Sequence, residues 1–473
     1  MGKRNRQKII HLKNIKIIDI ANKGKSLAKH EGRVIFIDKG VPGDICDIIV
    51  YNRRKKFWQA RIEKINEYSK KRSQPKCEHF GTCGGCKWQN MEYTRQIKFK
   101  QNEVINNLKR IGGLELPKHK EIIPCENQYF YRNKMEFSFS NKRWITSEEI
   151  QSESKIVNKN ALGFHVPGMF DKVIDLQNCY LQKHPSNLIR LSVKNFADEN
   201  NLSYFDIRNN KGLLRNLMIR NSSSGQLMVL VQFFEKDDKS IKLLLEHLRK
   251  SFPEITSLLY VVNKKLNNTI YDQDIICFYG KNYIMEEMDG LHFKIGPKSF
   301  FQTNSEQAKI LYRKTKELAN ITNKDIVYDL YTGTGTIAQF VANSAKKVIG
   351  IDSVEEGIIA ANQNAKHNSI NNCNFYTGDM KEIFTDDFIE KNGKPDIIIT
   401  DPPRDGMHKK VVEQILKIKA KRIVYVSCNS STQARDISLM EQMYRITEIQ
   451  PVDMFPQTHH VENIVVLNIK EYV

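Results

Sequence analysis

The sequence predicts a multidomain protein with a small N-terminal β-barrel, a central α/β domain and a C-terminal Rossmann-like α/β domain. Its 473 residues are enough for roughly two to four domains with cores of their own. Short β-prone runs separated by glycine turns fill the N-terminal part, and strands alternate regularly with helices from about residue 325. We therefore expect domains at 1–70, 71–290 and 291–473.

Composition indicates a cytoplasmic protein with a polyanionic partner. Lys and Arg outnumber Asp and Glu by 74 to 54, which points to nucleic acid, although a lysine-rich, AT-biased proteome would give the same balance. No run approaches about 18 apolar residues, so we expect no transmembrane helix and no membrane partner. The basic residues 1–8 lead into no signal-peptide core. Nine cysteines in such a protein favour metal binding or catalysis over disulfides.

Residues 1–70 are predicted to form an OB-like barrel. The β-prone runs lie at 15–20, 33–37, 44–50 and 57–62. Short strands at this spacing, with a basic run at 53–56 and the aromatics Tyr51, Phe57 and Trp58 interleaved, suit a barrel that holds RNA. A solvated basic face over ordinary core aromatics explains the pattern equally well.

A cysteine cluster follows the barrel. Three cysteines fall within ten residues: Cys77, Cys83 and Cys86. Thiolates are soft metal ligands, and a closed site needs a fourth, for which Cys125 and Cys179 are candidates and His79 a weaker one. Structural zinc often uses two C-x-x-C pairs, whereas only one is present, so an iron–sulfur cluster is at least as well supported as zinc.

The middle of the chain mixes helical and strand patterns. Helices are expected at 94–110 and 241–250, and strands at 131–139, 227–234 and 257–262. This mixture predicts a central α/β domain, in which only Cys179 suggests chemistry.

The C-terminal part has a nucleotide-binding pattern. A strand at 325–330 opens into a loop with Gly333 and Gly335, a helix starts at Ile337, and the next strand ends in Asp352. Glycines allow close backbone approach and the acid can hold ribose hydroxyls. The loop is neither a dinucleotide fingerprint nor a Walker loop. Because Asp329 and Asp379 could take the ammonium and adenine amino groups of S-adenosylmethionine, we favour a methyltransferase over a dehydrogenase.

Two further strands end in chemically suggestive residues. One runs into Asp401-Pro402-Pro403-Arg404, where amino-group methylases usually carry an aromatic residue in place of Arg404. The other, 424–427, runs into Cys428. A thiol at a strand end lies where open α/β sheets bind their ligands, although most free cysteines are small buried hydrophobes.

Five segments, in this order, resemble the RNA uridine-5-methyltransferases: 300–304, 329–335, 401–404, 426–429 and 460–462. The resemblance spans nearly the whole chain. It implies that the barrel is a TRAM domain. It also implies that four cysteines hold the [4Fe–4S] cluster of the 23S ribosomal RNA branch, with zinc as the alternative: Cys77, Cys83, Cys86 and Cys179.

The resemblance also assigns the chemistry. It implies that Cys428 adds to carbon 6 of a uridine and that Glu462 removes the carbon 5 proton. It places S-adenosylmethionine against Gln302, Tyr331, Asp352, Asp379 and Asp401.

The same resemblance predicts the substrate. We expect a monomer that methylates a flipped or single-stranded uridine of 23S rRNA. The alternatives are a transfer RNA uridine-5-methyltransferase, although bacterial members of that branch lack the barrel and the cluster, and an RNA-binding or ribosome-assembly protein with a vestigial methylase domain. Two residues depart from the family: Thr336 replaces an Asn, and Ser430 replaces the Pro that usually follows Ser-Cys-Asn, which should loosen that loop.

Overall fold

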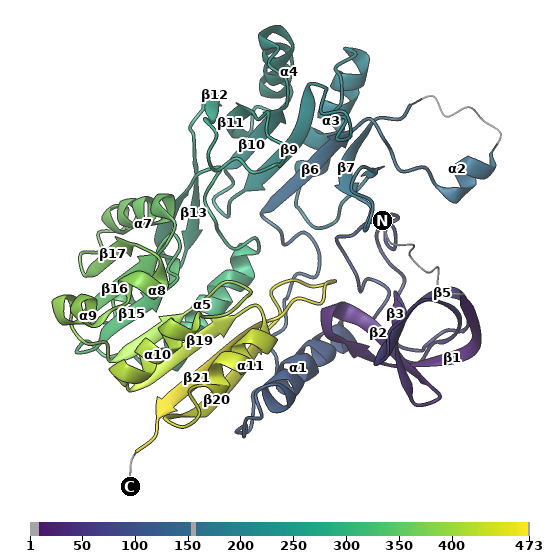
Figure 1. Cartoon of the computed structure of the whole chain (residues 1–473). Helices are drawn as coiled ribbons and strands as arrows, with labels where there is room; N and C mark the ends of the chain where they lie inside the picture. Colours follow the sequence, from purple (N-terminus) through teal and green to yellow (C-terminus); the bar gives the residue numbers. More distant parts are fainter. Residues whose placement is uncertain (1–8, 153–157, 472–473) are drawn as a thin grey trace, which may run out of the picture.

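The computed structural model describes residues 9–152 and 158–471, so the basic segment at 1–8 lies outside the described residues. The described chain forms a barrel, two large sheets with helices and one β-hairpin (Figure 1). The expected multidomain architecture is confirmed. No helix among the described residues is long and apolar enough to cross a membrane.

The N-terminal barrel is closed by five strands in the order β1-β2-β3-β5-β4. They are β1 (Ile10–Ala21), β2 (Lys25–His30), β3 (Arg33–Asp38), β4 (Ile45–Arg53) and β5 (Phe57–Glu67). Alternating apolar side chains such as Ile17, Ile35 and Ile48 fill its interior and are fully buried. The sequence did not predict β2, because its inward residues are the small Ser26 and Ala28.

The central sheet has seven strands in the order β12-β11-β10-β9-β6-β7-β8. They are β6 (Lys134–Ser140), β7 (Ala161–His165), β8 (Val173–Asp175), β9 (Leu214–Asn221), β10 (Leu227–Phe233), β11 (Ile255–Val262) and β12 (Ile276–Gly280). The helices here are α2 (Ser147–Gln151), α3 (Ser186–Glu199) and α4 (Asp238–Ser251). Strand β6 starts later than the predicted residue 131, because Arg132 and Asn133 donate their backbone N–H groups to Leu181 and Thr303 outside the sheet.

The C-terminal sheet has the order β17-β16-β15-β18-β19-β21-β20. Its strands are β15 (Ile326–Leu330), β16 (Lys347–Asp352), β17 (Cys373–Thr377), β18 (Ile397–Thr400), β19 (Arg422–Ser427), β20 (Tyr444–Val452) and β21 (Glu462–Ile469). The first five in spatial order run parallel, whereas β21 is antiparallel to both β19 and β20. The sequence analysis missed β20, which is interrupted by an irregularity between Ile446 and Glu448.

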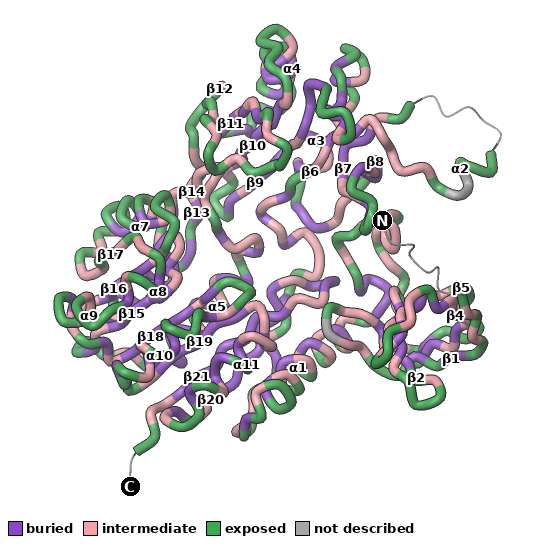
Figure 2. Tube along the Cα trace, viewed as in Figure 1, coloured by how far each residue is buried: buried purple, intermediate pink, exposed green. Residues whose placement is uncertain are grey.

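Seven helices accompany this sheet within the described residues. They are α5 (Ser305–Ala319), α6 (Thr336–Ala342), α7 (Glu355–His367), α8 (Met380–Ile383), α9 (Asp386–Asn392), α10 (Lys409–Ile418) and α11 (Ser430–Ser438). Figure 2 shows that the sheet strands are mostly buried while the outer helix faces are exposed. Because β15, β16, β18 and β19 run parallel, their carboxyl ends lie along one edge of the sheet.

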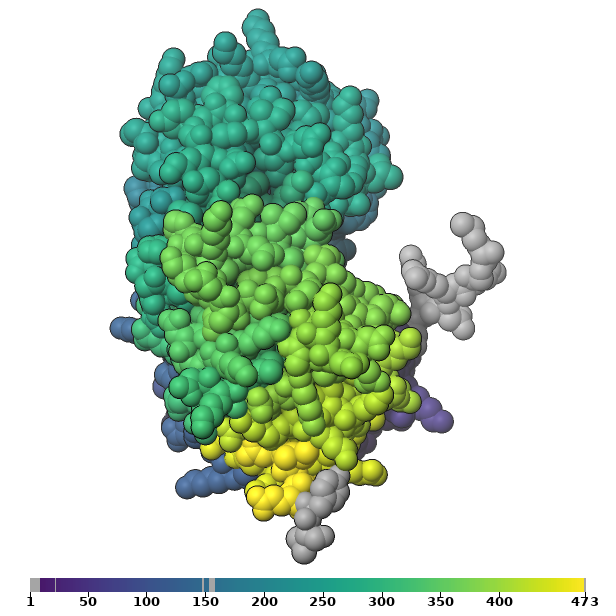
Figure 3. Space-filling model, turned by 90° about the vertical axis from the view of Figure 1, so that its left-hand side faces the viewer, coloured from purple at the N-terminus to yellow at the C-terminus, as the bar shows by residue number. Residues whose placement is uncertain are grey.

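Two smaller elements lie against the large C-terminal sheet and its helices: a β-hairpin and helix α1. A hairpin of β13 (Ile284–Met288) and β14 (Leu291–Ile295) spans the predicted boundary at 290 and packs on α6 and α7. Helix α1 (Tyr93–Arg110), which precedes the central sheet, packs on α11 and β20. In Figure 3 the central part, in teal, sits directly on the C-terminal part, in green to yellow.

Candidate active site

The antiparallel strand β21 brings Glu462 beside Cys428. Ser427, the last residue of β19, is paired with Asn463, so Cys428 follows this pair on one strand while Glu462 precedes it on the other. Asp401, which follows β18, lies close enough to both for its charge to raise their pKa values. Three predicted site residues thus meet at the edge of the sheet, although they are far apart in the sequence.

Cys428 occupies a turn that is held on both sides. Asn429 caps α11 by accepting the N–H of Ser431 at 3.1 Å, and its amide donates to the carbonyl of Arg404 at 2.8 Å. Burial raises the pKa of the half-buried Cys428 thiol to about 11, and Glu462 and Asp401 add to the increase. The Arg404 side chain, which hydrogen-bonds the thiol, acts in the opposite direction.

Arg404 is the functional candidate that sequence reasoning missed. The sequence analysis used it only to exclude amino-group methylases, whereas its charge lowers the pKa of both Cys428 and Glu462. The available signal was its position directly after a strand end that neighbours the strand of the nucleophile.

Two of the acids at this edge, Asp329 and Glu462, are buried, and Asp401 is half-buried. Asp329 is 1% exposed, and burial raises its pKa to about 7. Its Oδ2 accepts hydrogen bonds from Thr332 at 2.6 Å and from the N–H of Ala338 at 3.0 Å, but its buried Oδ1 has no partner. Burial and the charge of Asp329 raise the pKa of Asp401, and burial and Asp401 raise that of Glu462 well above its ordinary value. Such a set of acids fits a ligand that carries positive charge.

The glycine loop after β15 forms a cradle next to these acids. Tyr331, Gly333 and Gly335 all have left-handed backbone conformations, with φ of 65°, 55° and 73°. The N–H of Gly333 donates to Asp352 Oδ2 at 2.9 Å, and a Cβ on Gly333 would meet nothing within 4 Å. The loop thus leaves open space at Gly333, four residues after the buried Asp329. This fits the methionine part of S-adenosylmethionine, whose ammonium and sulfonium are cationic.

Gln302 and Asp379, the remaining predicted cofactor residues, have different surroundings, and so does Thr336, which departs from the family. The Gln302 carbonyl accepts a hydrogen bond from the Asn133 amide at 2.9 Å, which ties it to the central module. Asp379 is exposed, caps α8 and pairs with Lys381 at 3.2 Å. Thr336, the first residue of α6, is buried with its hydroxyl 3.2 Å from that of Thr334.

Two histidines, His459 and His460, precede Glu462 closely in the chain. Burial lowers the pKa of His459 to about 3 and that of His460 to about 4. Both imidazoles are therefore neutral at physiological pH. The positive charge in this region comes from Lys87, Lys100 and Arg404, whose fields also disfavour the imidazolium forms.

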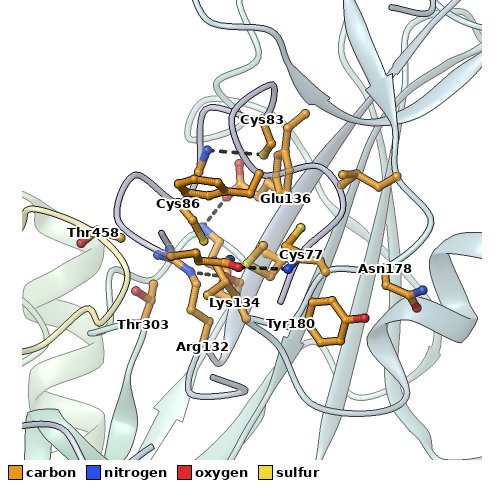
Figure 4. Close-up of a pocket in the computed structure, with 18 residues that line it drawn as sticks. Cys77, Cys83, Cys86, Arg132, Lys134, Glu136, Asn178, Tyr180, Thr303 and Thr458 are labelled. Carbon is orange, nitrogen blue, oxygen red and sulfur yellow. Dashed lines mark hydrogen bonds and ion pairs between the residues drawn. The ribbon is translucent and has the colours of Figure 1, made fainter. Parts of the chain in front are cut away.

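Four of the cysteines line one cavity between the segment 77–89 and the central sheet, and three of them are labelled in Figure 4. The cavity, of about 380 Å³, is lined by Cys77, Cys83, Cys86 and Cys179 together with Tyr180, Arg132, Thr303 and Thr458. All four cysteines are free, and burial raises the pKa of each thiol. Among residues 9–152 and 158–471, however, no three His, Cys, Asp or Glu side chains converge closely enough to hold a metal ion.

The other candidate ligands lie elsewhere or are already engaged. Cys125 is buried against Asn304, whose amide lies 3.6 Å from the sulfur, and it does not line the cavity. His79 accepts the backbone N–H of Gln177 at 3.0 Å through Nε2. Of the three candidate fourth ligands, only Cys179 lines the cavity together with Cys77, Cys83 and Cys86.

Comparisons with known proteins agree on one family. Residues 223–470 match the tRNA (uracil-5-)-methyltransferase family. An uncharacterised RNA methyltransferase of Bacteroides thetaiotaomicron is 51% identical over 95% of this chain and 100% of its own, and one of Porphyromonas gingivalis is 49% identical over 96% and 99%. The crystal structure of Pyrococcus abyssi tRNA (uracil-54, C5)-methyltransferase in complex with S-adenosyl-L-homocysteine superposes with a TM-score of 0.74 at 29% identity, covering 96% of this chain and 100% of that one.

Proposed function

Because the chain belongs to the tRNA (uracil-5-)-methyltransferase family and is a SAM-dependent RNA (uracil-5-)-methyltransferase, we propose that it methylates carbon 5 of one or two uridines in 23S rRNA. In this proposal it acts as a cytoplasmic monomer, and its barrel is a TRAM domain that holds RNA. The observation that carries the proposal is the register of β19 and β21, which puts Cys428 and Glu462 side by side with Arg404 against the thiol.

Cys428 acts as the nucleophile. Its thiolate forms a bond to carbon 6 of the uracil, and the electrons of the C5–C6 double bond move toward the O4 oxygen, so that carbon 5 becomes nucleophilic. Arg404 stabilises the thiolate that this step needs. S-adenosylmethionine, when bound, supplies the methyl group to carbon 5 and leaves as the neutral thioether.

Glu462 acts as the base. It takes the proton from carbon 5, the C5–C6 double bond re-forms, and the sulfur–carbon bond breaks to release the Cys428 thiolate. Burial raises the pKa of Glu462, which makes the ionised carboxylate a stronger base, while Arg404 favours that ionised form. In this mechanism Cys428 forms the covalent adduct, and Glu462 starts the elimination that releases it.

The cofactor residues divide by charge. Asp329 and Asp401, at the edge of the C-terminal sheet, would face the cationic parts of the cofactor. Asp352 would hydrogen-bond its ribose hydroxyls. Gln302, Tyr331 and Asp379 complete the proposed set. The unpartnered Oδ1 of Asp329 supports this arrangement.

We assign the cysteine cavity to a [4Fe–4S] cluster, with zinc as the alternative. The support for this proposal is that four free cysteines line one cavity of about 380 Å³ and that thiolates are the usual ligands of such a group, although no three of the described side chains converge on one metal position in the structure. In this assignment the cluster supports the fold beside the active site, because nothing in the methyl transfer calls for electron transfer. Protein purified without oxygen should contain iron and absorb visible light, and Cys179→Ser should lose both. Zinc without visible absorbance would overturn the assignment.

The test of the mechanism is a trapped adduct. Glu462→Gln keeps the shape of the side chain but cannot take the carbon 5 proton, so a covalent protein–RNA species should accumulate with uridine-containing RNA and cofactor and be visible on a denaturing gel. The exposed Glu441→Gln is the matched control and should turn over without an adduct. Full activity of Glu462→Gln with no adduct would contradict the assigned roles.

A transfer RNA substrate is the second candidate. It is favoured by the Pyrococcus enzyme, which is a tRNA (uracil-54, C5)-methyltransferase and whose structure superposes on 96% of this chain. Mapping 5-methyluridine in both 23S rRNA and tRNA of a deletion strain separates the two, since only the true substrate should lose the modification. Loss from neither RNA would leave the vestigial-enzyme alternative.

A further inference from the structure

Three aromatic rings surround one exposed lysine beside the cysteine cavity. The ammonium of Lys76 lies 5.2 Å from the ring centroid of Tyr129, 5.0 Å from that of Phe130 and 4.9 Å from that of Tyr180. Phe130 and Tyr180 meet edge to face at 6.0 Å. All three rings are only partly buried. We call Tyr129, Phe130 and Tyr180 the ring cluster.

The backbone at the ring cluster is strained. Phe130 has a φ of 57°, a left-handed conformation that disfavours a bulky side chain. Its N–H donates to the carbonyl of Tyr180 at 2.8 Å, which fixes the two rings relative to each other. Glycine would adopt this conformation without strain. The chain therefore carries an aromatic side chain at a position where the backbone conformation favours glycine. Strain of this kind collects at binding sites.

Tyr180 of the ring cluster lines a cavity that also includes residues next in the chain to candidate active-site residues. Arg132, two residues after Phe130, lies with its guanidinium 5.8 Å from the ring centroid of Phe455. Figure 4 shows Tyr180 and Arg132 lining the same cavity as Thr303 and Thr458, which neighbour Gln302 and His459 in the chain. A nucleotide next to a uridine held at Cys428 could therefore reach the rings from outside the space that we assign to the metal group.

We propose that the ring cluster binds one unpaired nucleobase that flanks the target uridine, with Lys76 and Arg132 contacting the adjacent phosphates. Aromatic faces stack on any base, and nearby cations track the backbone, which is how proteins hold single-stranded RNA. The inference rests on the proposed function for its choice of ligand. It names a binding subsite that takes no part in bond making.

The test measures RNA affinity separately from catalysis. A fluorescein-labelled single-stranded RNA of mixed sequence is titrated with Cys428→Ala protein in the absence of cofactor, and its Kd is read by fluorescence anisotropy. Adding Phe130→Gly should weaken binding about tenfold, the loss expected for one stacked base, without lowering the unfolding temperature, because glycine relieves the strain. The salt dependence of Kd should be unchanged, whereas Lys76→Ala should reduce its slope by about one unit.

Two further variants complete the design. Tyr180→Ala should weaken binding like Phe130→Gly, so that a fault in one variant does not decide the result. Tyr279→Ala removes an exposed ring that pairs with Arg249 at 4.8 Å at the other edge of the central sheet and should bind RNA normally. Normal affinity in both ring-cluster variants, or an equal loss in Tyr279→Ala, would overturn the proposal. Since the parent lacks the nucleophile, failure of the methylation mechanism would leave this result intact.

Discussion

At the scale of the residue, the thiol of Cys428 is held in its protonated form by its surroundings. Burial and the two acids raise its pKa to about 11, and Arg404 is the cation that opposes them. Catalysis at neutral pH therefore depends on Arg404 and on any positive charge that the cofactor brings.

The reactivity of Cys428 should follow this pKa. In the free protein, alkylation of Cys428 by iodoacetamide should speed up about tenfold per pH unit between about pH 7 and 9, because the thiolate fraction rises by that factor below the pKa. Arg404→Gln should slow the reaction several-fold at every pH. Mass spectrometry of the Cys428 peptide gives the rate, and the exposed Cys277 in the same sample is the internal reference. A rate independent of pH would refute the raised pKa.

The buried acids predict a pH-dependent cofactor affinity. With its pKa raised to about 7, Asp329 is largely protonated below that pH in the free protein, and a cationic ligand favours its ionised form. S-adenosylmethionine should therefore bind more weakly as the pH falls from about 8 to 6, with a proton released on binding. Calorimetry in buffers of different ionisation enthalpy measures that proton. Asp329→Asn should remove the pH dependence, whereas Asp379→Asn should keep it; the reverse pattern would contradict our assignment.

Sequence reasoning proposed the reacting residues but not the neighbouring groups that shift their pKa values. Cys428 and Glu462 were predicted through the family resemblance, since a glutamate before a strand has no signal of its own. The effect of the Arg404 charge on Cys428 and Glu462, and the position of Asp401 beside them, depend on which strands are neighbours in the sheet. The order of the strands is set by the sheet topology.

At the scale of the element, the turn that carries Cys428 is tied to helix α1. Asn107 of α1 donates its amide to the hydroxyl of Ser430 at 2.8 Å. Ser430 is the first residue of α11 and the position where the family usually has Pro. The structure therefore shows a hydrogen bond where a looser loop was expected from the missing ring.

This hydrogen bond should position the nucleophile. Asn107→Ala should lower kcat about fivefold, the loss of roughly 1 kcal/mol for one hydrogen bond, with the KM for the cofactor unchanged. Ser430→Pro should restore kcat in that background, since Pro is favoured at the first helical position and Asn429, with φ of −138° and ψ of 92°, has the extended conformation required before it. Steady-state kinetics checks both, with the exposed Asn106→Ala as the control. An unchanged kcat in Asn107→Ala would show that the bond is dispensable.

Helices and strands could be predicted where apolar and polar residues alternate with the period of the element. The strand expected at 325–330 is β15 (Ile326–Leu330), and the next expected strand ends at Asp352, as β16 (Lys347–Asp352) does. Strand β2 was missed because it buries Ser26, whose hydroxyl donates to the carbonyl of Gly40 at 2.6 Å in place of an apolar contact. A polar inward residue has no hydrophobic periodicity to detect.

At the scale of the whole molecule, the segment that leads to Glu462 is where the modules meet. The carbonyl of Gln457 accepts the N–H groups of Lys87 and Trp88, and Trp88 donates to Gly24 of the barrel at 3.4 Å. From the central module, Tyr131 donates to the carbonyl of Pro456 at 2.9 Å. Because these contacts are polar and join distant parts of the chain, the sequence could not predict how the modules dock.

A buried ion pair anchors this junction and should be costly to break. Lys100 of α1 is fully buried and contacts Asp453 at 2.6 Å, and Asp453 also accepts the Tyr93 hydroxyl at 2.7 Å. Lys100→Met leaves the Asp453 charge buried and unpaired, so the docking of α1 should lose about 3–5 kcal/mol. Hydrogen exchange followed by mass spectrometry should show faster exchange along α1. Lys98→Met, exposed on the same helix, should exchange like the parent, and adding Asp453→Asn to Lys100→Met should recover part of the protection by removing the orphaned charge. Unchanged protection of α1 in Lys100→Met would mean that the apolar face of α1, with Val104 and Leu108, holds the modules together without the ion pair.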